Sequence, residues 1–378
     1  MIYFDNGATS YPKPKGMTAA MEECILKYCG NPGRSGHYMS MKTGEEVYEA
    51  RKKIAKVFGI KEVERLIFTK NTTEALNLGI IGFLNEGDHV ITTSMEHNSV
   101  LRPLKSLEKK GITHTIVSGD AKGLIKPEQI QRKIRDNTKL IITTHASNVT
   151  GTILDIKEIG RIARENNITY MVDGAQSSGN CSIDVSEMGI DMLGFPGHKG
   201  LLGPLGTGGL YVSPNTNIRP LLCGGTGTES KSRIHPCDMP EGFEAGTVNA
   251  PAIIGLGFSA EYVNKIGVEA IGAYERELIS RFENGIRNIK KVQVYGPKPT
   301  EKTGICLFNI EGFGCEDVTA QLNNDYGIAV RGGYHCAGLA HKTIGTWDQG
   351  AVRLSVGPFN TKREIDYAIE VIWRMCRM

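Results

Sequence analysis

The sequence lacks long hydrophobic runs: nowhere do about 18 apolar residues follow one another, the length that a helix needs to cross a bilayer. Its first ten residues, MIYFDNGATS, have neither the basic region nor the apolar core of an export signal. It also has no block of one charge, because 44 basic and 41 acidic residues are spread along 378 positions and give a net charge of +3. These absences argue against membrane and nucleic-acid binding, and we expect a cytoplasmic location.

The nine cysteines form no CxxC pair and no framework of short spacings, which argues against disulfides and against a zinc site. No metal is expected, and no repeat or low-complexity tract is present. Free cysteine usually behaves as a small buried hydrophobe, and we expect this of most of the nine. Cys336 requires a separate interpretation because of the residues around it.

Short β-branched apolar runs alternate with amphipathic segments. The runs are residues 65–69, 89–94, 139–145 and 169–174, and the segment that begins at Asp155 has helical spacing with Asp155 as a plausible N-cap. This alternation predicts an α/β fold with a mainly parallel sheet covered by helices. A long helical stretch at about 251–289 follows. We therefore expect a large domain of residues 15–250, and a smaller α+β domain formed by residues 1–14 and 251–378.

Polar residues lie where parallel strands end, which is where such sheets bind ligands. Thr72 and Thr73 open a predicted helix, whose free N–H groups favour an anion, although a simple threonine N-cap would also explain them. Asp173 ends a buried strand and needs either a cationic partner or exposure to water. Lys199 lies in the glycine-rich stretch GFPGHKGLLGPLGTGGLYV, where a planar group could approach the backbone.

A lone lysine in a turn would simply be exposed, but Lys199 completes a set. An anion site, a strand-end carboxylate and a lysine are the parts that hold pyridoxal 5'-phosphate. The anion site binds the phosphate, the carboxylate binds the pyridine nitrogen, and the lysine forms a covalent bond to the cofactor. A crowded lysine also has a lowered pKa and reacts with carbonyl groups. The sequence thus predicts a cofactor site on the large domain.

Nine motifs, in the family's order, make the chain resemble the class V, fold-type I pyridoxal-phosphate enzymes, and within them the group II cysteine desulfurases and selenocysteine lyases. The resemblance runs nearly from end to end. The motifs are YFDNGATS, NTTEALN, MEHNSV, HASNVTGTI, VDGAQSSG, GHKGLLGPLGTGGLYV, FEAGTVN, RGGYHCAG and AVRLSVGPFNT.

The resemblance implies the cofactor contacts. Lys199 would bind the cofactor covalently and move protons at the substrate α-carbon, and Asp173 would keep the pyridine nitrogen protonated. Gln176 would donate a hydrogen bond to the ring oxygen, and His97 would stack on the ring as a catalytic residue. The phosphate would be held by Thr72, Thr73 and His198, and by Thr247 from the other subunit of a homodimer. Pro196 stands where the family usually has a serine, so one phosphate donor is missing.

The resemblance also implies the substrate half of the site. Arg353 would pair with the substrate α-carboxylate, with Asn148 near the ring oxygen or that carboxylate, and Arg331 is assigned to the same half. Cys336, in RGGYHCAG, would be the catalytic thiol, with Arg331 and His335 close enough to favour its thiolate. Its short loop implies a shielded persulfide that needs an acceptor protein or a reductant.

The reaction implied is conversion of L-cysteine to L-alanine, with the sulfur carried on Cys336 as a persulfide. L-selenocysteine is an alternative substrate, and other class V reactions such as transamination or epimerisation, or a non-catalytic role in sulfur assembly, stay open. The loop of residues 224–247 would lie near the dimer interface and the mouth of the site. It contains Cys237, for which a passive surface role and a role in sulfur transfer are both open.

Overall fold

The computed structural model describes residues 1–33 and 35–377 of the chain. Its centre is a seven-stranded sheet in the order β2-β8-β7-β6-β5-β3-β4. β8 runs antiparallel to both of its neighbours, and the other four pairings, which join β3 to β7, are parallel, so the predicted mainly parallel sheet is confirmed. The strands are β2 (Leu66–Thr69), β3 (His89–Thr93), β4 (Thr113–Val117), β5 (Thr138–Thr144), β6 (Thr169–Asp173), β7 (Met192–Pro196) and β8 (Gly208–Val212).

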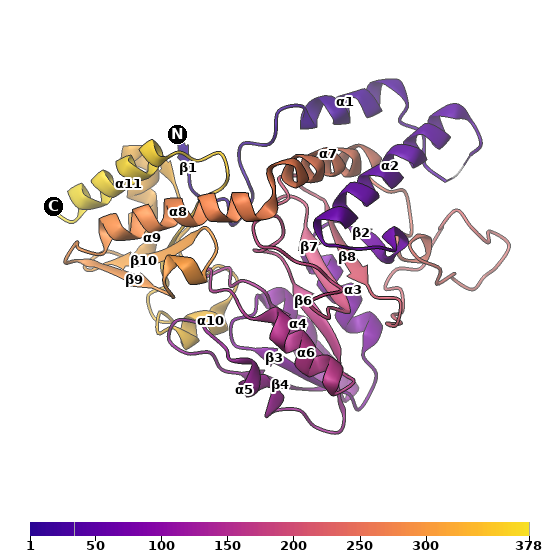
Figure 1. Ribbon diagram of the computed structural model, residues 1–378, viewed down its shortest axis with the longest axis horizontal. Helices are drawn as coiled ribbons and strands as arrows, with labels where there is room; N and C mark the ends of the chain where they lie inside the picture. The colour runs from indigo at the N-terminus through magenta and orange to yellow at the C-terminus, as the bar shows by residue number, and fades with distance from the viewer. Residues whose placement is uncertain (34, 378) are drawn as a thin grey trace.

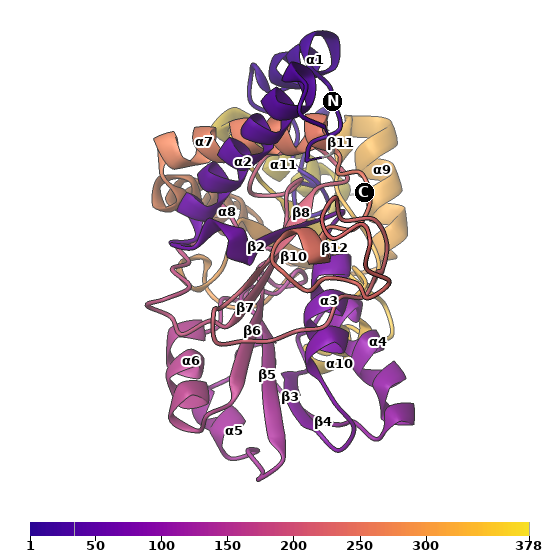
Figure 2. The same ribbon diagram turned by 90° about the vertical axis from the view of Figure 1, so that its right-hand side faces the viewer.

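Successive residues of each central strand pack on opposite faces of this sheet. In β5, Ile141 joins one hydrophobic core, whereas Leu140 and Ile142 join the other. This follows from the two-residue period of a strand, and it explains why the strands read as continuous apolar runs. Both faces are therefore covered by helices, as Figure 2 shows with the sheet seen nearly edge-on.

Two sets of helices provide that cover. One face packs against α3 and α4, and the other against α2, α6 and α7. In α6 the predicted N-cap is confirmed, because Asp155 Oδ1 accepts a hydrogen bond from the Glu158 N–H at 3.0 Å. The helices of this part are α1 (Met17–Lys27), α2 (Tyr38–Val57), α3 (Thr72–Phe83), α4 (Asn98–Leu107), α5 (Pro127–Gln131), α6 (Ile156–Glu165) and α7 (Ala250–Ile266).

The C-terminal part has a separate core that also includes Phe4. A three-stranded antiparallel sheet, in the order β12-β10-β9, packs against helices, and β1 pairs in parallel with β11. In Figure 1 the N-terminus and β1 lie at the same end of the molecule as the C-terminal helix α11. The chain's first residues thus lie against its last third, while the predicted boundary at residues 250/251 stays a prediction. The elements are β1 (Ile2–Tyr3), α8 (Val268–Ile286), β9 (Val292–Tyr295), β10 (Ile305–Ile310), α9 (Cys315–Tyr326), β11 (Ile328–Ala329), α10 (Gly338–Thr343), β12 (Val352–Ser355) and α11 (Lys362–Met375).

The long helix expected at about 251–289 is two helices. α7 ends at Ile266, and Gly267 has φ 92°, a conformation that side chains with a Cβ rarely adopt, before α8 begins at Val268. A helical period continues across the break, which is why the sequence pattern reads as one segment. Within the described residues no helix is both long and apolar enough to cross a membrane. The cytoplasmic location stays a prediction.

Candidate active site

A cavity lies where the parallel strands end, and it gathers most of the predicted cofactor residues. Its walls come from the start of α3, the turn after β3, and the segments that follow β5, β6 and β7. The residues that line it are Asn71, Thr72, Thr73, Leu76, His97, Ser99, Thr144, Ala146, Asn148, Asp173, Ala175, Gln176, His198 and Lys199.

The first turn of α3 forms one wall. The N-cap is Asn71, whose Oδ1 accepts from the Glu74 N–H at 3.0 Å, so the alternative that a threonine caps this helix is wrong. Thr72 is buried, and Thr73 follows it in the first turn. The first N–H groups of a helix have no acceptor within the helix, and together with the helix dipole they favour an anion.

A short hydrogen-bonded chain joins this wall to His97. The Thr73 and Ser99 hydroxyl oxygens are 2.8 Å apart, and Ser99 Oγ lies 2.9 Å from His97 Nδ1. His97 Nδ1 also accepts the Ser99 backbone N–H at 3.0 Å, so the neutral ring carries its proton on Nε2. Burial and the positive charges of Lys199 and Arg331 lower the pKa of His97 to about 4. His97 is therefore an uncharged ring beside the cavity at neutral pH.

Asp173 ends β6 and is buried, with 2% of its surface exposed. Its Oδ1 accepts the Ala175 N–H at 2.9 Å. Burial raises the pKa of its carboxyl group, while this hydrogen bond and the charge of Lys199 oppose that effect. The sequence leaves two alternatives for Asp173, a cationic partner or exposure to water, and exposure is wrong. A buried carboxylate with so few partners can accept a hydrogen bond from a cationic ring nitrogen in the cavity.

Lys199 lies four residues beyond Phe195 of β7, in a turn that only glycines can form. A Cβ on Gly197 would meet Thr207 Oγ1 at 2.1 Å, and one on Gly200 would meet the Ser178 carbonyl at 2.2 Å. Burial, followed by the charge of Arg353, lowers the pKa of Lys199 to about 8. A substantial fraction of this amine is therefore neutral near physiological pH and available as a nucleophile.

His198 and Gln176 complete the cavity with polar groups. His198 Nδ1 is buried and makes no hydrogen bond to the described residues, while burial, Lys199 and Lys13 lower the pKa of its ring to about 4. Gln176 Nε2 donates to the Gly7 carbonyl at 2.9 Å. An N-terminal segment that sequence reasoning left without a role therefore holds one wall of the site.

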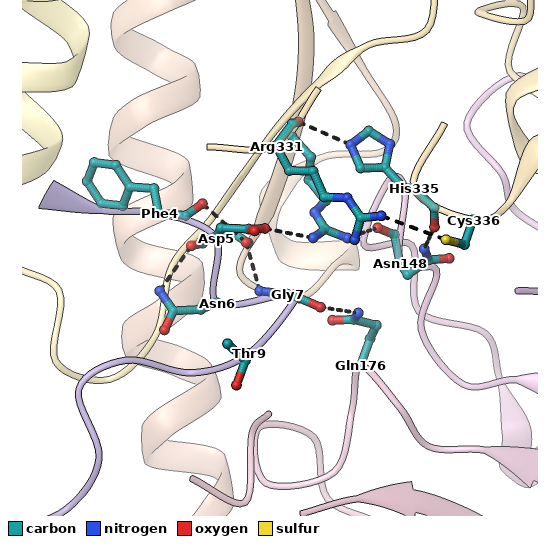
Figure 3. Close-up of polar contacts among 12 residues, drawn as sticks. Phe4, Asp5, Asn6, Gly7, Thr9, Asn148, Gln176, Arg331, His335 and Cys336 are labelled. Atoms are coloured by element: carbon teal, nitrogen blue, oxygen red, sulfur yellow. Dashed lines mark hydrogen bonds and ion pairs between the residues drawn. The ribbon is translucent and has the colours of Figure 1, made fainter. Parts of the chain in front are cut away.

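Arg353, on β12, is 1% exposed and contacts Asn148, a residue that lines the cavity. Figure 3 shows Asn148 and Asp5 among the polar contacts of this region. One terminal nitrogen of Arg353 donates to Asp5 Oδ1 at 2.9 Å and the other to the Asn148 carbonyl at 2.9 Å. Its Nε–H is buried and makes no hydrogen bond to the described residues. Asp5 belongs to the motif YFDNGATS, but the motif alone did not indicate which of its residues contacts the site.

Cys336 lies on a loop with unusual backbone geometry. It and His335 both have positive φ, 58° and 51°, which residues with a Cβ adopt only where the surrounding structure holds them. The Asn148 side chain donates to the His335 carbonyl at 2.6 Å, and the Asn98 N–H donates to the Cys336 carbonyl at 2.9 Å. The loop is thus fastened both to the strand-end residue Asn148 and to the start of α4.

The thiol itself is exposed in this chain, so the expectation that the short loop shields a persulfide on Cys336 is wrong. Arg331 lies beside the thiol with a guanidinium nitrogen 3.7 Å from Sγ, as Figure 3 shows. The sequence predicts that His335 favours the thiolate of Cys336, but the structure gives His335 no positive charge with which to do so. Its ring is buried and bonded to the Arg331 carbonyl and to His341, at 3.2 Å each, and burial lowers its pKa to about 2. His335 therefore supports the loop as a neutral ring, and Arg331 is the cation next to the thiol.

The remaining predicted residues lie outside the cavity. Thr247 is exposed and lies 3.4 Å from the Asn31 amide, on the long loop between β8 and α7 that projects to the right in Figure 1. Cys237 is exposed on the same loop, and Pro196 is buried at the end of β7. The expectation that most cysteines are buried is wrong: three are buried, two are half-buried and four are exposed, which are Cys29, Cys223, Cys237 and Cys336.

Comparison with known proteins gives a consistent result. The family model described as Aminotransferase class-V matches residues 2–368. A probable cysteine desulfurase of Methanothermobacter thermautotrophicus is 36% identical, with 100% of this chain and 95% of that protein covered. A cysteine desulfurase of Haloferax volcanii is 31% identical, with 98% of this chain and 88% of that protein covered. The solved apo structure of a cysteine desulfurase from Thermococcus onnurineus has a TM-score of 0.94 at 36% identity, covering 100% of this chain and 94% of that one.

Proposed function

This chain belongs to the class-V aminotransferase family, and from that premise we propose that it is a pyridoxal-phosphate-dependent cysteine desulfurase whose sulfur acceptor is Cys336. The net reaction converts L-cysteine and the Cys336 thiol into L-alanine and a Cys336 persulfide. The observation that carries the proposal is the pairing of a buried amine, Lys199, with an exposed thiol on a loop fastened to the same site.

The cavity fits the cofactor. Asp173 is a buried carboxylate suited to a protonated pyridine nitrogen, and the first turn of α3 with the unbonded His198 Nδ1 suits a phosphate. Pro196 is buried and has no N–H to give, so the phosphate would depend on Thr72, Thr73 and His198. His97 would lie against the ring as a neutral imidazole.

Pyridoxal phosphate, when bound, supplies an electron sink that acidifies the substrate α-proton and labilises the carbon–sulfur bond. Lys199 would carry the cofactor until the substrate amine replaces it, and would then take the α-proton on Nζ as a neutral amine. Asp173 would hold the proton on the pyridine nitrogen, which keeps the sink effective. These two roles follow from the burial of both groups in one cavity.

Arg353 would bind the substrate carboxylate, with the Asn148 side chain beside it. Cys336 would then attack the substrate sulfur as a thiolate, with the Arg331 guanidinium beside its Sγ. A sulfur–sulfur bond forms, the carbon–sulfur bond breaks with its electron pair left on the substrate carbon, and that carbon takes up a proton to become the methyl group of alanine. The exposed persulfide would pass its sulfur to an acceptor protein or to a reductant thiol.

We also propose a homodimer. Thr247 lies away from the cavity of its own chain and is exposed, which is consistent with a contact to the phosphate site of a second copy. L-selenocysteine is included as a second substrate of the same site, since selenium leaves carbon more readily than sulfur does.

The test is alanine production from L-cysteine, and separately from L-selenocysteine, with a reductant present. We expect the wild type to act on L-cysteine, Cys336→Ala to lose that activity, and the equally exposed control Cys237→Ala to keep it. Alanine from selenocysteine alone, persisting in Cys336→Ala, would identify a selenium-releasing enzyme. No alanine from either substrate would reject the proposal and move the search to other reactions of the family.

A further inference from the structure

The environment of Arg353 contains a carboxylate before any substrate arrives. Its guanidinium is buried, and the Asp5 carboxylate is the acid that pairs with it, at 2.9 Å. The Asp5 side chain is 21% exposed, so one side of this ion pair is in contact with water while the other is not. An ion pair with one hydrated member can be rearranged at lower cost than one that is buried on both sides.

The backbone holds Asp5 in place independently of its side chain. The Asp5 carbonyl accepts the Ala8 N–H at 3.0 Å, Ser355 N–H donates to the Phe4 carbonyl at 2.7 Å, and Asn6 N–H donates to the Ser355 carbonyl at 3.3 Å. Figure 3 shows this segment, with Phe4, Asp5, Asn6 and Gly7 labelled. Replacing the Asp5 side chain by an amide of the same shape therefore leaves the segment anchored.

The donors of Arg353 are only partly used. A guanidinium has five N–H donors; one goes to Asp5, one to the Asn148 carbonyl, and the Nε–H makes no hydrogen bond to the described residues. A second carboxylate bound to the same guanidinium would use the remaining donors and would then lie beside Asp5 on the same cation. Two carboxylates that share one guanidinium repel each other, and each weakens the binding of the other.

We propose that Asp5 is a specificity-determining residue: it is a resident carboxylate on Arg353 that the α-carboxylate of the amino acid must share or displace. This inference rests on the proposed function, because it takes Arg353 as the carboxylate site. Asp5 then lowers the affinity for the substrate and, equally, for the product L-alanine, which carries the same carboxylate. Release of alanine is faster as a result.

The experiment compares two ligands that differ only in the carboxylate, L-alanine and ethylamine. Their dissociation constants are measured with the cofactor-loaded enzyme, from the change in its visible absorption. In Asp5→Asn we expect L-alanine to bind about tenfold more tightly, because the amide keeps the shape and hydrogen bond without the negative charge, and ethylamine to bind as in the wild type. Asp366→Asn removes an exposed charge elsewhere and serves as the control, with no change in either constant.

Weaker binding of L-alanine to Asp5→Asn would overturn the proposal, since it would mean that Asp5 orients Arg353 for the ligand. An equal change for both amines would also overturn it, because a general distortion of the site does not discriminate by carboxylate. Steady-state kinetics give a second test. Asp5→Asn should lower KM for L-cysteine, and it should also lower kcat if the release of alanine limits turnover. Absence of desulfuration in the wild type would reject the proposed function, whereas the ligand comparison can still be read from the absorption change.

Discussion

The pKa of Lys199 offers a quantitative test of the site, because it predicts how fast the apoprotein captures its cofactor. Only the neutral amine attacks the aldehyde. With the pKa lowered to about 8, half of Lys199 is neutral at pH 8, whereas an ordinary lysine with a pKa of 10.5 would be about 0.3% neutral. Capture at pH 8 should therefore be roughly 150-fold faster than for an unshifted lysine.

The perturbation is Arg353→Gln, because the charge of Arg353 is, after burial, the largest cause of the lowered pKa. Removing it also leaves Asp5 unpaired, and that negative charge raises the pKa of Lys199 further. Each unit by which the pKa rises makes capture at pH 8 up to about tenfold slower.

The assay strips the cofactor, adds pyridoxal phosphate at a series of pH values from 6 to 10, and follows the visible absorption band. The sign is fixed by the chemistry: the rate rises with pH and reaches a plateau above the pKa, so the wild type should level off soon after pH 8 and Arg353→Gln at higher pH. Arg374→Gln, an exposed arginine on α11, is the control. A wild-type rate that keeps rising to pH 10, or the same profile in Arg353→Gln, would refute this account of Lys199.

Two further predictions concern the buried charges. Asp173→Asn should retain the fold but bind pyridoxal phosphate at least about tenfold more weakly, because an amide cannot hold the ring nitrogen in its protonated form. Equilibrium dialysis measures the affinity, and a dissociation constant equal to that of the wild type would contradict this prediction. Lys302→Met should lower the free energy of unfolding by up to about 3 kcal/mol, because Lys302 and Glu283 form a fully buried ion pair and Glu283 then keeps only the partly exposed Arg287 as a cation among the described residues; the double variant with Glu283→Leu should recover most of that loss. Urea denaturation compares the two variants, and an equal loss in both would show that the charge left on Glu283 is not the cause.

The large sheet and its ligand edge could be predicted from the sequence because their signals are local. Apolar β-branched runs mark β5 and β6, and the residues at and just beyond their ends, including Asp173, reach the cavity simply because parallel strands end at one edge. The break between α7 and α8 was missed, since one glycine does not interrupt the helical period.

The contacts that cross the chain could not be predicted in this way. Asp5 contacts Arg353, and Asn148 holds the His335 carbonyl, because segments far apart in the sequence pack together in the fold, and no spacing rule links such positions. The charge state of His335 was misjudged for the same reason: its neutrality comes from burial, from the positive charge of Arg353 and from its contact with His341, which the sequence around it does not reveal.

The pairing of Asp5 with Arg353 also bears on how the protein is made. The two residues are 348 positions apart, so at ribosomal speeds Asp5 leaves the ribosome on the order of 20 to 70 s before its partner is synthesised. Most of the residues that line the cofactor cavity have emerged by residue 199, when the arginine and the thiol do not yet exist. The residues of the cofactor cavity are therefore all made before Cys336 and Arg353, and an unfinished chain lacks the proposed carboxylate site and the acceptor thiol until synthesis has passed residues 336 and 353.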